Sequence, residues 1–282
     1  MLSPVVLTPF DRARTMSRRI PIRRWTPAWR PSPDCGPLLF RDAGRHLLPG
    51  WSLEWLLQAF GQARVPVRTG AATAAMSLAR AVGLAARSRR SAKIGFDLDL
   101  PYVTDWDFSA APGIARRFRR PDFARRDPLL EIPRSRRPRL VWLYFGGSRS
   151  GTPLHCDVLG AHAWSLVVSG SKDWAFYPPG TDFGDNPIGT NVFAPGGRRE
   201  DERAGRVRWT ARVGPGDLIF VPSKWWHQVR NREPTLAMGG NFISPDIAPL
   251  VLRECDKMDY RHISHQLLQS YGDRLSELRD AA

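Results

Sequence analysis

Hydrophobic and polar residues alternate in short runs over the second half of the chain. These runs are rich in β-branched and aromatic side chains, and Gly- or Pro-containing turns such as 178–180 and 214–217 separate them. The runs cover residues 140–145, 164–169, 174–177, 207–213, 218–221, 227–230 and 235–243. Many short strands separated by turn residues predict a mainly β fold, either a sandwich or a barrel.

The first half of the chain has a mixed pattern that predicts an α/β segment ahead of these strands. The expected helices are 51–60 and 74–87, and the expected short strands are 37–42 and 65–68. Ser52 is placed to cap the first helix and Gly61 to end it. The segment 111–139 is rich in Arg and Pro, so we expect a loop with short helical turns there.

The two ends of the chain differ from the middle. Residues 1–20 are polar and basic and predict a poorly ordered tail, which leaves 21–245 as the main domain and 246–282 as a helical segment. Leucines and a tyrosine recur there near the helical period, at Leu267, Leu268, Tyr271, Leu275 and Leu278. The stripe can pack on the parent domain or pair two subunits. Packing is the commoner use, so a homodimer is one option only.

Composition narrows the class of protein. The chain has 282 residues, and 42% of them are hydrophobic, which is enough for the core of one large domain. No apolar run approaches the roughly 18 residues that a membrane helix needs, and the N-terminus lacks a signal-peptide pattern. Cys35, Cys156 and Cys255 are odd in number and far apart, so no disulfide framework is indicated. These features predict a cytoplasmic protein without a membrane partner.

The charge of the chain is strongly positive, at +15, and only four of its 42 basic residues are lysines. Arginines cluster at 18–24, 87–90, 116–126 and 134–139. A basic face could bind an acidic protein, RNA or a ribosomal surface, or it could be a solvated, Arg-biased surface. The clusters lack interleaved aromatic residues and any nucleic-acid motif. The sequence therefore favours the solvated surface, and a nucleic-acid partner is open but not favoured.

Candidate metal ligands occur at His155, Asp157 and His227. Alternate side chains of a strand share one face, so His155 and Asp157 would point at the same place. His227 follows 70 positions after Asp157, at the start of a later β-run. Two histidines and one carboxylate on one face of a metal leave positions open for other ligands. That set is typical of non-haem Fe(II) oxygenases.

Lys172 is a second candidate for function. It lies 17 residues after His155 and close to Gly170. Its ammonium could pair with an anionic cosubstrate, or it could be a solvated lysine of a turn. Nearly all other basic residues of the chain are arginines. A lysine at position 172 therefore indicates that a compact point charge is needed there.

Two segments carry a resemblance to a known family. Residues 147–179 (GSRSGTPLHCDVLGAHAWSLVVSGSKDWAFYPP) and 216–245 (GDLIFVPSKWWHQVRNREPTLAMGGNFISP) resemble the core of Jumonji-C (JmjC) hydroxylases, most closely the branch of protein lysyl hydroxylases. Residues 37–67 resemble the lead-in of these proteins. The resemblance implies a double-stranded β-helix, that is a cupin or jelly-roll barrel, with an N-terminal α/β lead-in and C-terminal helices. It makes 21–245 the catalytic domain.

The resemblance also implies roles for the candidate residues. His155, Asp157 and His227 would bind Fe(II) and form the catalytic centre. Lys172 would pair with the distal carboxylate of the cosubstrate 2-oxoglutarate, and Thr152 would add a hydroxyl hydrogen bond to the same group. These roles rest on the family likeness and not on spacing alone.

Three further positions are less specific. Tyr102 matches a family tyrosine that contacts the same carboxylate, and Asn241 would lie near the metal and the cosubstrate. Ordinary packing or a turn hydrogen bond is the alternative for both. Some close relatives carry Asn where this chain has Ser165, which has one donor instead of two. This departure concerns the cosubstrate contact and leaves the metal ligands unaffected.

The implied activity is that of a dioxygenase that uses Fe(II), 2-oxoglutarate and dioxygen to hydroxylate a protein or peptide side chain. One alternative is a hydroxylase of a small molecule, such as a natural product. Another is a non-catalytic cupin that only binds a partner, but the complete ligand set together with Lys172 argues against it. Histone lysine demethylation is less favoured, since no reader domain or zinc-binding cysteine cluster accompanies the barrel.

Overall fold

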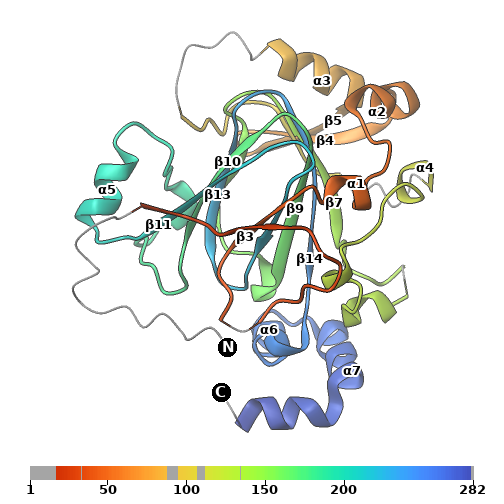
Figure 1. The fold of residues 1–282 in the computed structure, drawn as a ribbon, viewed down its shortest axis with the longest axis vertical. Helices are drawn as coiled ribbons and strands as arrows, with labels where there is room; N and C mark the ends of the chain where they lie inside the picture. Colours follow the sequence, from red (N-terminus) through yellow and green to blue (C-terminus); the bar gives the residue numbers. More distant parts are fainter. Residues whose placement is uncertain (1–16, 33, 88–94, 107–111, 134, 281–282) are drawn as a thin grey trace.

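The computed structural model describes residues 17–32, 34–87, 95–106, 112–133 and 135–280. Two β-sheets face each other, and the helices lie around them (Figure 1). The expected tail reached residue 20, but Ser17–Arg19 form strand β1, which pairs with a strand from the second half of the chain. That part of the expectation is wrong, and residues 1–16 lie outside the described ranges.

The smaller sheet has five strands in the order β1-β11-β10-β13-β8. Its other strands are β11 (Arg208–Val213), β10 (Lys172–Tyr177), β13 (Trp226–Asn231) and β8 (Gly151–His155). All its neighbouring strands are antiparallel except β1 and β11. The sheet thus combines the two strands that carry the candidate histidines with the strand that begins at Lys172.

The larger sheet has nine strands in the order β2-β3-β12-β9-β14-β7-β6-β4-β5. The strands are β2 (Ile22–Arg24), β3 (Leu38–Arg41), β12 (Leu218–Val221), β9 (His162–Ser169), β14 (Thr235–Phe242), β7 (Val141–Gly146), β6 (Tyr102–Trp106), β4 (Arg64–Thr69) and β5 (Ala72–Ser77). The lead-in supplies the edge strands of this sheet. The fold is mainly β and two-layered, as a cupin or jelly-roll barrel is, which confirms the predicted fold class.

Buried apolar residues of the described ranges form three clusters, and the two largest lie on opposite faces of the larger sheet. Side chains between the two sheets include Val167, Trp174, Ile219 and Val229, which are almost fully buried. The opposite face of the larger sheet packs against the lead-in helices and buries the larger core. Those helices are α1 (Gly44–Leu47), α2 (Leu53–Phe60), α3 (Leu78–Arg87) and α4 (Pro112–Ala115). The larger core therefore supplies much of the buried apolar area, and polar residues can occupy part of the barrel interior.

The lead-in confirms one helix prediction and corrects the other. Helix α2 begins after Ser52, whose Oγ accepts a hydrogen bond from Trp55 N at 3.0 Å, and Gly61 is its C-cap. The helix expected at 74–87 begins only at Leu78, because residues 72–77 form β5 and pair with β4. Backbone pairing with a neighbouring strand overrides the high helix propensity of this alanine-rich segment.

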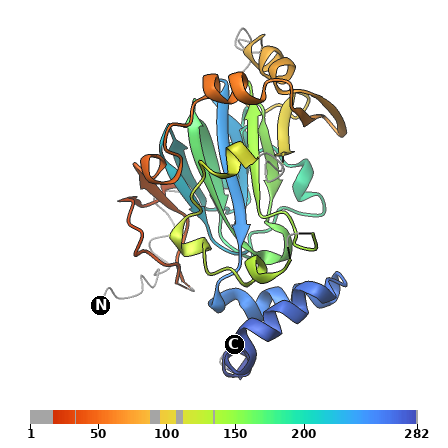
Figure 2. The same ribbon diagram turned by 90° about the vertical axis from the view of Figure 1, so that its right-hand side faces the viewer.

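The C-terminal helices α6 (Ala248–Lys257) and α7 (Arg261–Asp280) lie at one end of the barrel (Figure 2). Leu267 is fully buried and joins the larger core, whereas Leu268 is 54% exposed. Leu267 therefore packs on the parent domain. The side chains of Leu275 and Leu278 lie outside the described ones. No helix of the described ranges has the length and apolarity needed to cross a membrane.

A buried carboxyl group makes stability depend on pH. Asp127 is 2% exposed, and its Oδ1 accepts a hydrogen bond from Leu129 N at 3.0 Å at the start of a short 3-10 turn, Pro128–Glu131. Burial raises the pKa of Asp127 to about 7, although the Leu129 N–H and the Arg120 guanidinium act against this rise. Between the ordinary pKa and 7 the folded protein holds more protons than the unfolded chain. Stability contributed by Asp127 is therefore lost as the pH rises through this window.

From Asp127 alone we expect the free energy of unfolding to fall between pH 5 and pH 7, by at most about 1.4 kcal/mol per pH unit, whereas His227, whose pKa is lowered by burial, contributes a change of the opposite sign. Urea unfolding at several pH values measures the slope. Asp127→Asn keeps the shape and the acceptor for Leu129 but cannot ionise, so the stability of the wild type minus that of the variant should fall as the pH rises from 5 to 7. Equal slopes in the two proteins would show that Asp127 does not titrate in this range.

Candidate metal centre

Strand pairing brings the two candidate histidines together. His155 is the last residue of β8, and its register partner in β13 is His227. The ring centroids lie 4.1 Å apart. Asp157 comes just after the strand, at the start of the short turn Val158–Gly160, and not within the strand as the alternation argument assumed. One possible ligand atom from each of the three residues lies within 4.8 Å of the others, so the set could hold a single metal ion.

Both imidazoles are oriented by backbone carbonyls. The Nδ1 atom of His155 lies 2.9 Å from Pro153 O, and that of His227 lies 3.0 Å from Trp225 O. A carbonyl only accepts, so each Nδ1 carries the proton and donates, which leaves the Nε2 lone pair free for a metal. Burial, and secondarily the neighbouring His155, lowers the pKa of His227 to about 4. His227 is therefore neutral near pH 7, as a metal ligand must be.

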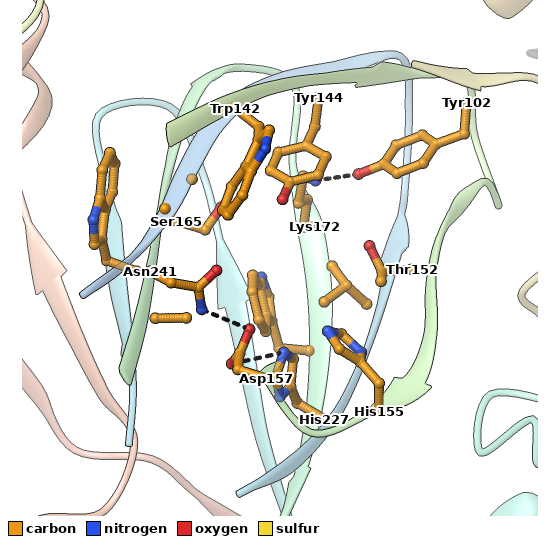
Figure 3. Close-up of a pocket in the computed structure, with 16 residues that line it drawn as sticks. Tyr102, Trp142, Tyr144, Thr152, His155, Asp157, Ser165, Lys172, His227 and Asn241 are labelled. Carbon is orange, nitrogen blue, oxygen red and sulfur yellow. Dashed lines mark hydrogen bonds and ion pairs between the residues drawn. The ribbon is translucent and has the colours of Figure 1, made fainter. Parts of the chain in front are cut away.

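The side-chain amide of Asn241 holds the carboxylate of Asp157 in place. Asn241 Nδ2, from β14, donates to Asp157 Oδ1 at 2.9 Å (Figure 3). The same Nδ2 atom lies 3.3 Å from His162 O. The other oxygen, Oδ2, lies 3.8 Å from His227 Nε2. One carboxylate oxygen is thus held by the protein while the other faces the histidines. Asn241 lies at the metal end of the pocket, in contact with a candidate ligand, so a simple packing role does not describe it.

Lys172 lies at the opposite end of the same pocket (Figure 3). It is the first residue of β10 and only 2% exposed, so the alternative of a solvated turn lysine is wrong. Its Nζ donates to Tyr102 OH at 3.0 Å and lies 5.5 Å from the ring centroids of Tyr102 and Tyr144. Among the described residues, no carboxylate lies within ion-pair distance of this ammonium. A buried charge without a counter-charge is costly, which indicates a place for an anion.

Comparison with known proteins identifies relatives of this chain. No protein-family model matches the chain. It is 31% identical over 168 residues to lysine-specific demethylase JMJ21 of Arabidopsis thaliana, covering 53% of this chain and 17% of that protein. It is 33% identical over 133 residues (41% and 32%) to the bifunctional arginine demethylase and lysyl-hydroxylase psr-1 of Caenorhabditis elegans. It is 31% identical over 155 residues (45% and 35%) to the 2-oxoglutarate and iron-dependent oxygenase JMJD4 of Gallus gallus.

The chain is a homologue of the JmjC-type oxygenases. This confirms the resemblance that residues 147–179 and 216–245 suggested. The matches span about a third or less of the length of these curated relatives. The comparisons therefore establish similarity over about half of this chain, and the activity of the whole protein is a separate question.

The remaining predicted residues of this JmjC homologue also line the pocket. Thr152, in β8, points into it between the histidines and Lys172, and Ser165 lines it from β9 (Figure 3). Tyr102, in β6, reaches Lys172 from the lead-in side. The structure thus brings all seven predicted site residues to one pocket, with the candidate metal ligands at one end and the Lys172 ammonium at the other.

Aromatic residues of the pocket were missed by the sequence analysis. Trp142 and Tyr144 face it from β7, where they alternate with buried apolar residues, a signal that was available in the sequence. Trp174 also lines the pocket, and its ring stacks near His227, with centroids 5.8 Å apart at 23°. Burial, with a further contribution from Tyr102, raises the pKa of Tyr144 well above its usual value. Tyr144 therefore stays a neutral hydrogen-bonding group beside Lys172.

Proposed function

We propose that the protein is an Fe(II)- and 2-oxoglutarate-dependent dioxygenase that hydroxylates a side chain of a protein or peptide. The observation that carries this proposal is the position of Lys172. Within the part of the chain that the structure describes, it is a buried cation with no carboxylate partner, and it shares one pocket with a candidate ligand set of two histidines and one aspartate. A metal site alone would fit many proteins, but this pairing fits a cosubstrate that binds a metal at one end and carries an anion at the other.

The donor set fits ferrous iron. His155 and His227 each present a free Nε2 lone pair, and Asp157 presents one oxygen while Asn241 holds the other. Three protein ligands on one face leave open positions, which is the arrangement of non-haem Fe(II) oxygenases. Bound iron would supply the activation of dioxygen, coupled to decarboxylation of 2-oxoglutarate to succinate and carbon dioxide. The protein would supply the ligand geometry and a water-poor cavity.

The other residues would orient the cosubstrate. Lys172 and Tyr102 would bind the distal carboxylate of 2-oxoglutarate, and the Thr152 hydroxyl would donate a further hydrogen bond to it. Asn241 would act on the metal side by keeping Asp157 in place. Trp174 would restrict water next to His227. Residues 21–245 would form the catalytic domain and 246–282 a helical extension.

The names of the relatives support a protein as substrate. They include a lysyl-hydroxylase and demethylases of lysine and arginine. These names share oxygenase chemistry on a protein side chain, and hydroxylation is the outcome we propose for this chain. We also propose a cytoplasmic location, for which the free thiols of Cys35, Cys156 and Cys255 are the support.

Succinate formation tests the proposed activity. Protein loaded with Fe(II) without oxygen is mixed with 2-oxoglutarate, air is admitted, and succinate is measured for the wild type and for His155→Ala. We expect slow formation that requires Fe(II) and falls by at least about 100-fold in the variant, because a metal ligand is lost. If the wild type makes no succinate and calorimetry shows no 2-oxoglutarate binding to the metal-loaded protein, a non-catalytic binding module becomes the better account.

A further inference from the structure

Arginines gather in a groove on the side of the smaller sheet that carries α5 (Gly197–Arg203). The groove has a volume of about 1290 Å³ and is lined by strands β1, β10, β11 and β13 of the smaller sheet, by β2 and β3 of the larger sheet, and by the segment 192–199 that leads into α5. In Figure 1, α5 lies beside these strands and away from α1–α4. The lining includes eight arginines, namely Arg19, Arg41, Arg198, Arg199, Arg208, Arg212, Arg230 and Arg232. Asp173 is the only acidic residue among the described residues that line it.

Strand alternation explains why these residues meet. In β10, Lys172 and Trp174 line the barrel pocket, so Asp173 between them points to the other face of the sheet. The register partners of Asp173 are Arg212 in β11 and Arg230 in β13. The arginines of these strands therefore lie on the face opposite the candidate metal centre. The arginines of the groove are thus separated from the candidate metal centre by the sheet, although Trp174 lines both hollows.

The positive charge of the groove is only partly balanced. Asp173 makes ion pairs with three arginines, to Arg212 at 3.3 Å, to Arg230 at 3.1 Å and to Arg232 at 3.1 Å. One carboxylate thus serves three guanidinium groups. It holds them close together, which like charges would otherwise resist.

Two further arginines have their own carboxylates outside the lining. Arg208 is buried and pairs with Asp201 at 2.6 Å, which also fixes α5 against the sheet, and Arg41 pairs with Asp217. Arg19, Arg198 and Arg199 are exposed, and no carboxylate of the described ranges lies within ion-pair distance of them. In the part of the chain that the structure describes, these three side chains are available to an outside anion.

We propose that this groove docks an extended, acidic segment of a partner protein. Guanidinium groups bind carboxylates through two parallel hydrogen bonds, and several of them in one groove fit a row of Asp or Glu side chains. The volume exceeds the roughly 300–1000 Å³ of pockets for small molecules, which favours a chain over a single small anion.

The aromatic residues argue against single-stranded nucleic acid in the groove. Binding of this kind relies on exposed rings on which bases stack. The described lining contains the rings of Phe193 and Trp174. Arg230 already covers Phe193, with its Cζ 4.7 Å from the ring centroid, and Trp174 is buried and stacked on Phe176. Carboxylate recognition therefore accounts for the groove better than base stacking. This inference does not depend on the proposed oxygenase activity.

Fluorescence anisotropy with a short, labelled, glutamate-rich peptide tests the docking site at physiological ionic strength. The groove variant combines Arg19→Glu, Arg198→Glu and Arg199→Glu, which break no ion pair within the described residues. The control combines Arg80→Glu, Arg136→Glu and Arg253→Glu, three exposed arginines outside the groove, so that the net charge changes equally. Thermal unfolding checks that both variants are folded.

We expect the groove variant to bind the peptide at least about tenfold more weakly than the wild type, and the control to change by less than about twofold. Equal losses in the two variants would show a general effect of net charge and overturn the proposal. A labelled oligouridine of equal length that binds the wild type more tightly than the peptide would overturn the choice of an acidic protein segment. Absence of peptide binding to the wild type would overturn the docking site itself.

Discussion

Lys172→Met is expected to abolish measurable 2-oxoglutarate binding while leaving metal binding intact. The ammonium is 2% exposed and has Tyr102 OH as its hydrogen-bond partner, so a distal carboxylate would be its counter-charge. Loss of one partner of a buried ion pair costs about 3–5 kcal/mol, which corresponds to a rise in Kd of roughly 100-fold or more. Calorimetry of 2-oxoglutarate binding to anaerobic, metal-loaded protein measures this change.

The same substitution should make the protein without cosubstrate more stable. Methionine removes an uncompensated buried charge and fills a similar volume, so the free energy of unfolding should rise. A lysine with a purely structural role would instead lose stability on substitution. Lys257→Met, at an exposed position that pairs with Glu254, is the matched control and should change neither quantity by much. Unaltered 2-oxoglutarate affinity in Lys172→Met would remove the main support for the proposed cosubstrate.

The strands of the barrel were predictable because each buries one face. The runs at 164–169, 174–177, 218–221 and 235–243 became strands with ends shifted by at most two residues. The edge strands β1, β2 and β5 were not predicted. They are short or largely exposed, and backbone pairing holds them in place, for β1 with the distant strand β11 and for β5 with the adjacent strand β4. A local pattern of apolar residues carries no information on a pairing of that kind.

The site was predictable to a different degree for different residues. Spacing selected His155, Asp157 and His227, and the rarity of lysine drew attention to Lys172. Tyr102 comes from a segment far from the others in sequence, and only the family resemblance pointed to it. The basic groove was missed, because Arg198, Arg212 and Arg230 lie outside the arginine clusters of the sequence and meet only after folding. The sequence favours a solvated basic surface, whereas the arrangement of the arginines in the groove favours a binding surface.

In the described part of the chain, Lys172 in the barrel and three arginines of the groove have no carboxylate within ion-pair distance, and the two regions lie on opposite faces of the smaller sheet. In the barrel, Lys172 is buried, and its interaction with an anion would be little weakened by salt. In the groove, Arg19, Arg198 and Arg199 are exposed, and their interactions would weaken as the salt concentration rises. Binding of 2-oxoglutarate and binding of an acidic segment should therefore differ clearly in their salt dependence. That difference allows the two sites to be studied separately in the same protein.

Asp157→Asn is expected to weaken Fe(II) binding by at least about 100-fold with little change in fold. The substitution removes the one negative charge among the three candidate ligands. It keeps an oxygen that can accept the hydrogen bond from Asn241 Nδ2, which lies 2.9 Å from Asp157 Oδ1 in the wild type. Loss of an anionic ligand should cost more than the 10–100-fold that loss of a ligand's hydrogen-bond partner costs. Competition with a chelator under anaerobic conditions measures the affinity.

Cys156→Ala is the matched control for this variant, since Cys156 lies between His155 and Asp157 in sequence. Its thiol is directed to Lys224 O at 3.5 Å and not to the metal pocket, and burial raises the pKa of Cys156 to about 12, so no thiolate competes for the metal near pH 7. Fe(II) affinity should stay within about twofold of the wild type in this control. If Asp157→Asn and Cys156→Ala bind Fe(II) equally well, Asp157 is not a metal ligand. The set of two histidines and one carboxylate would then have to be abandoned, and Fe(II) binding assigned to other residues.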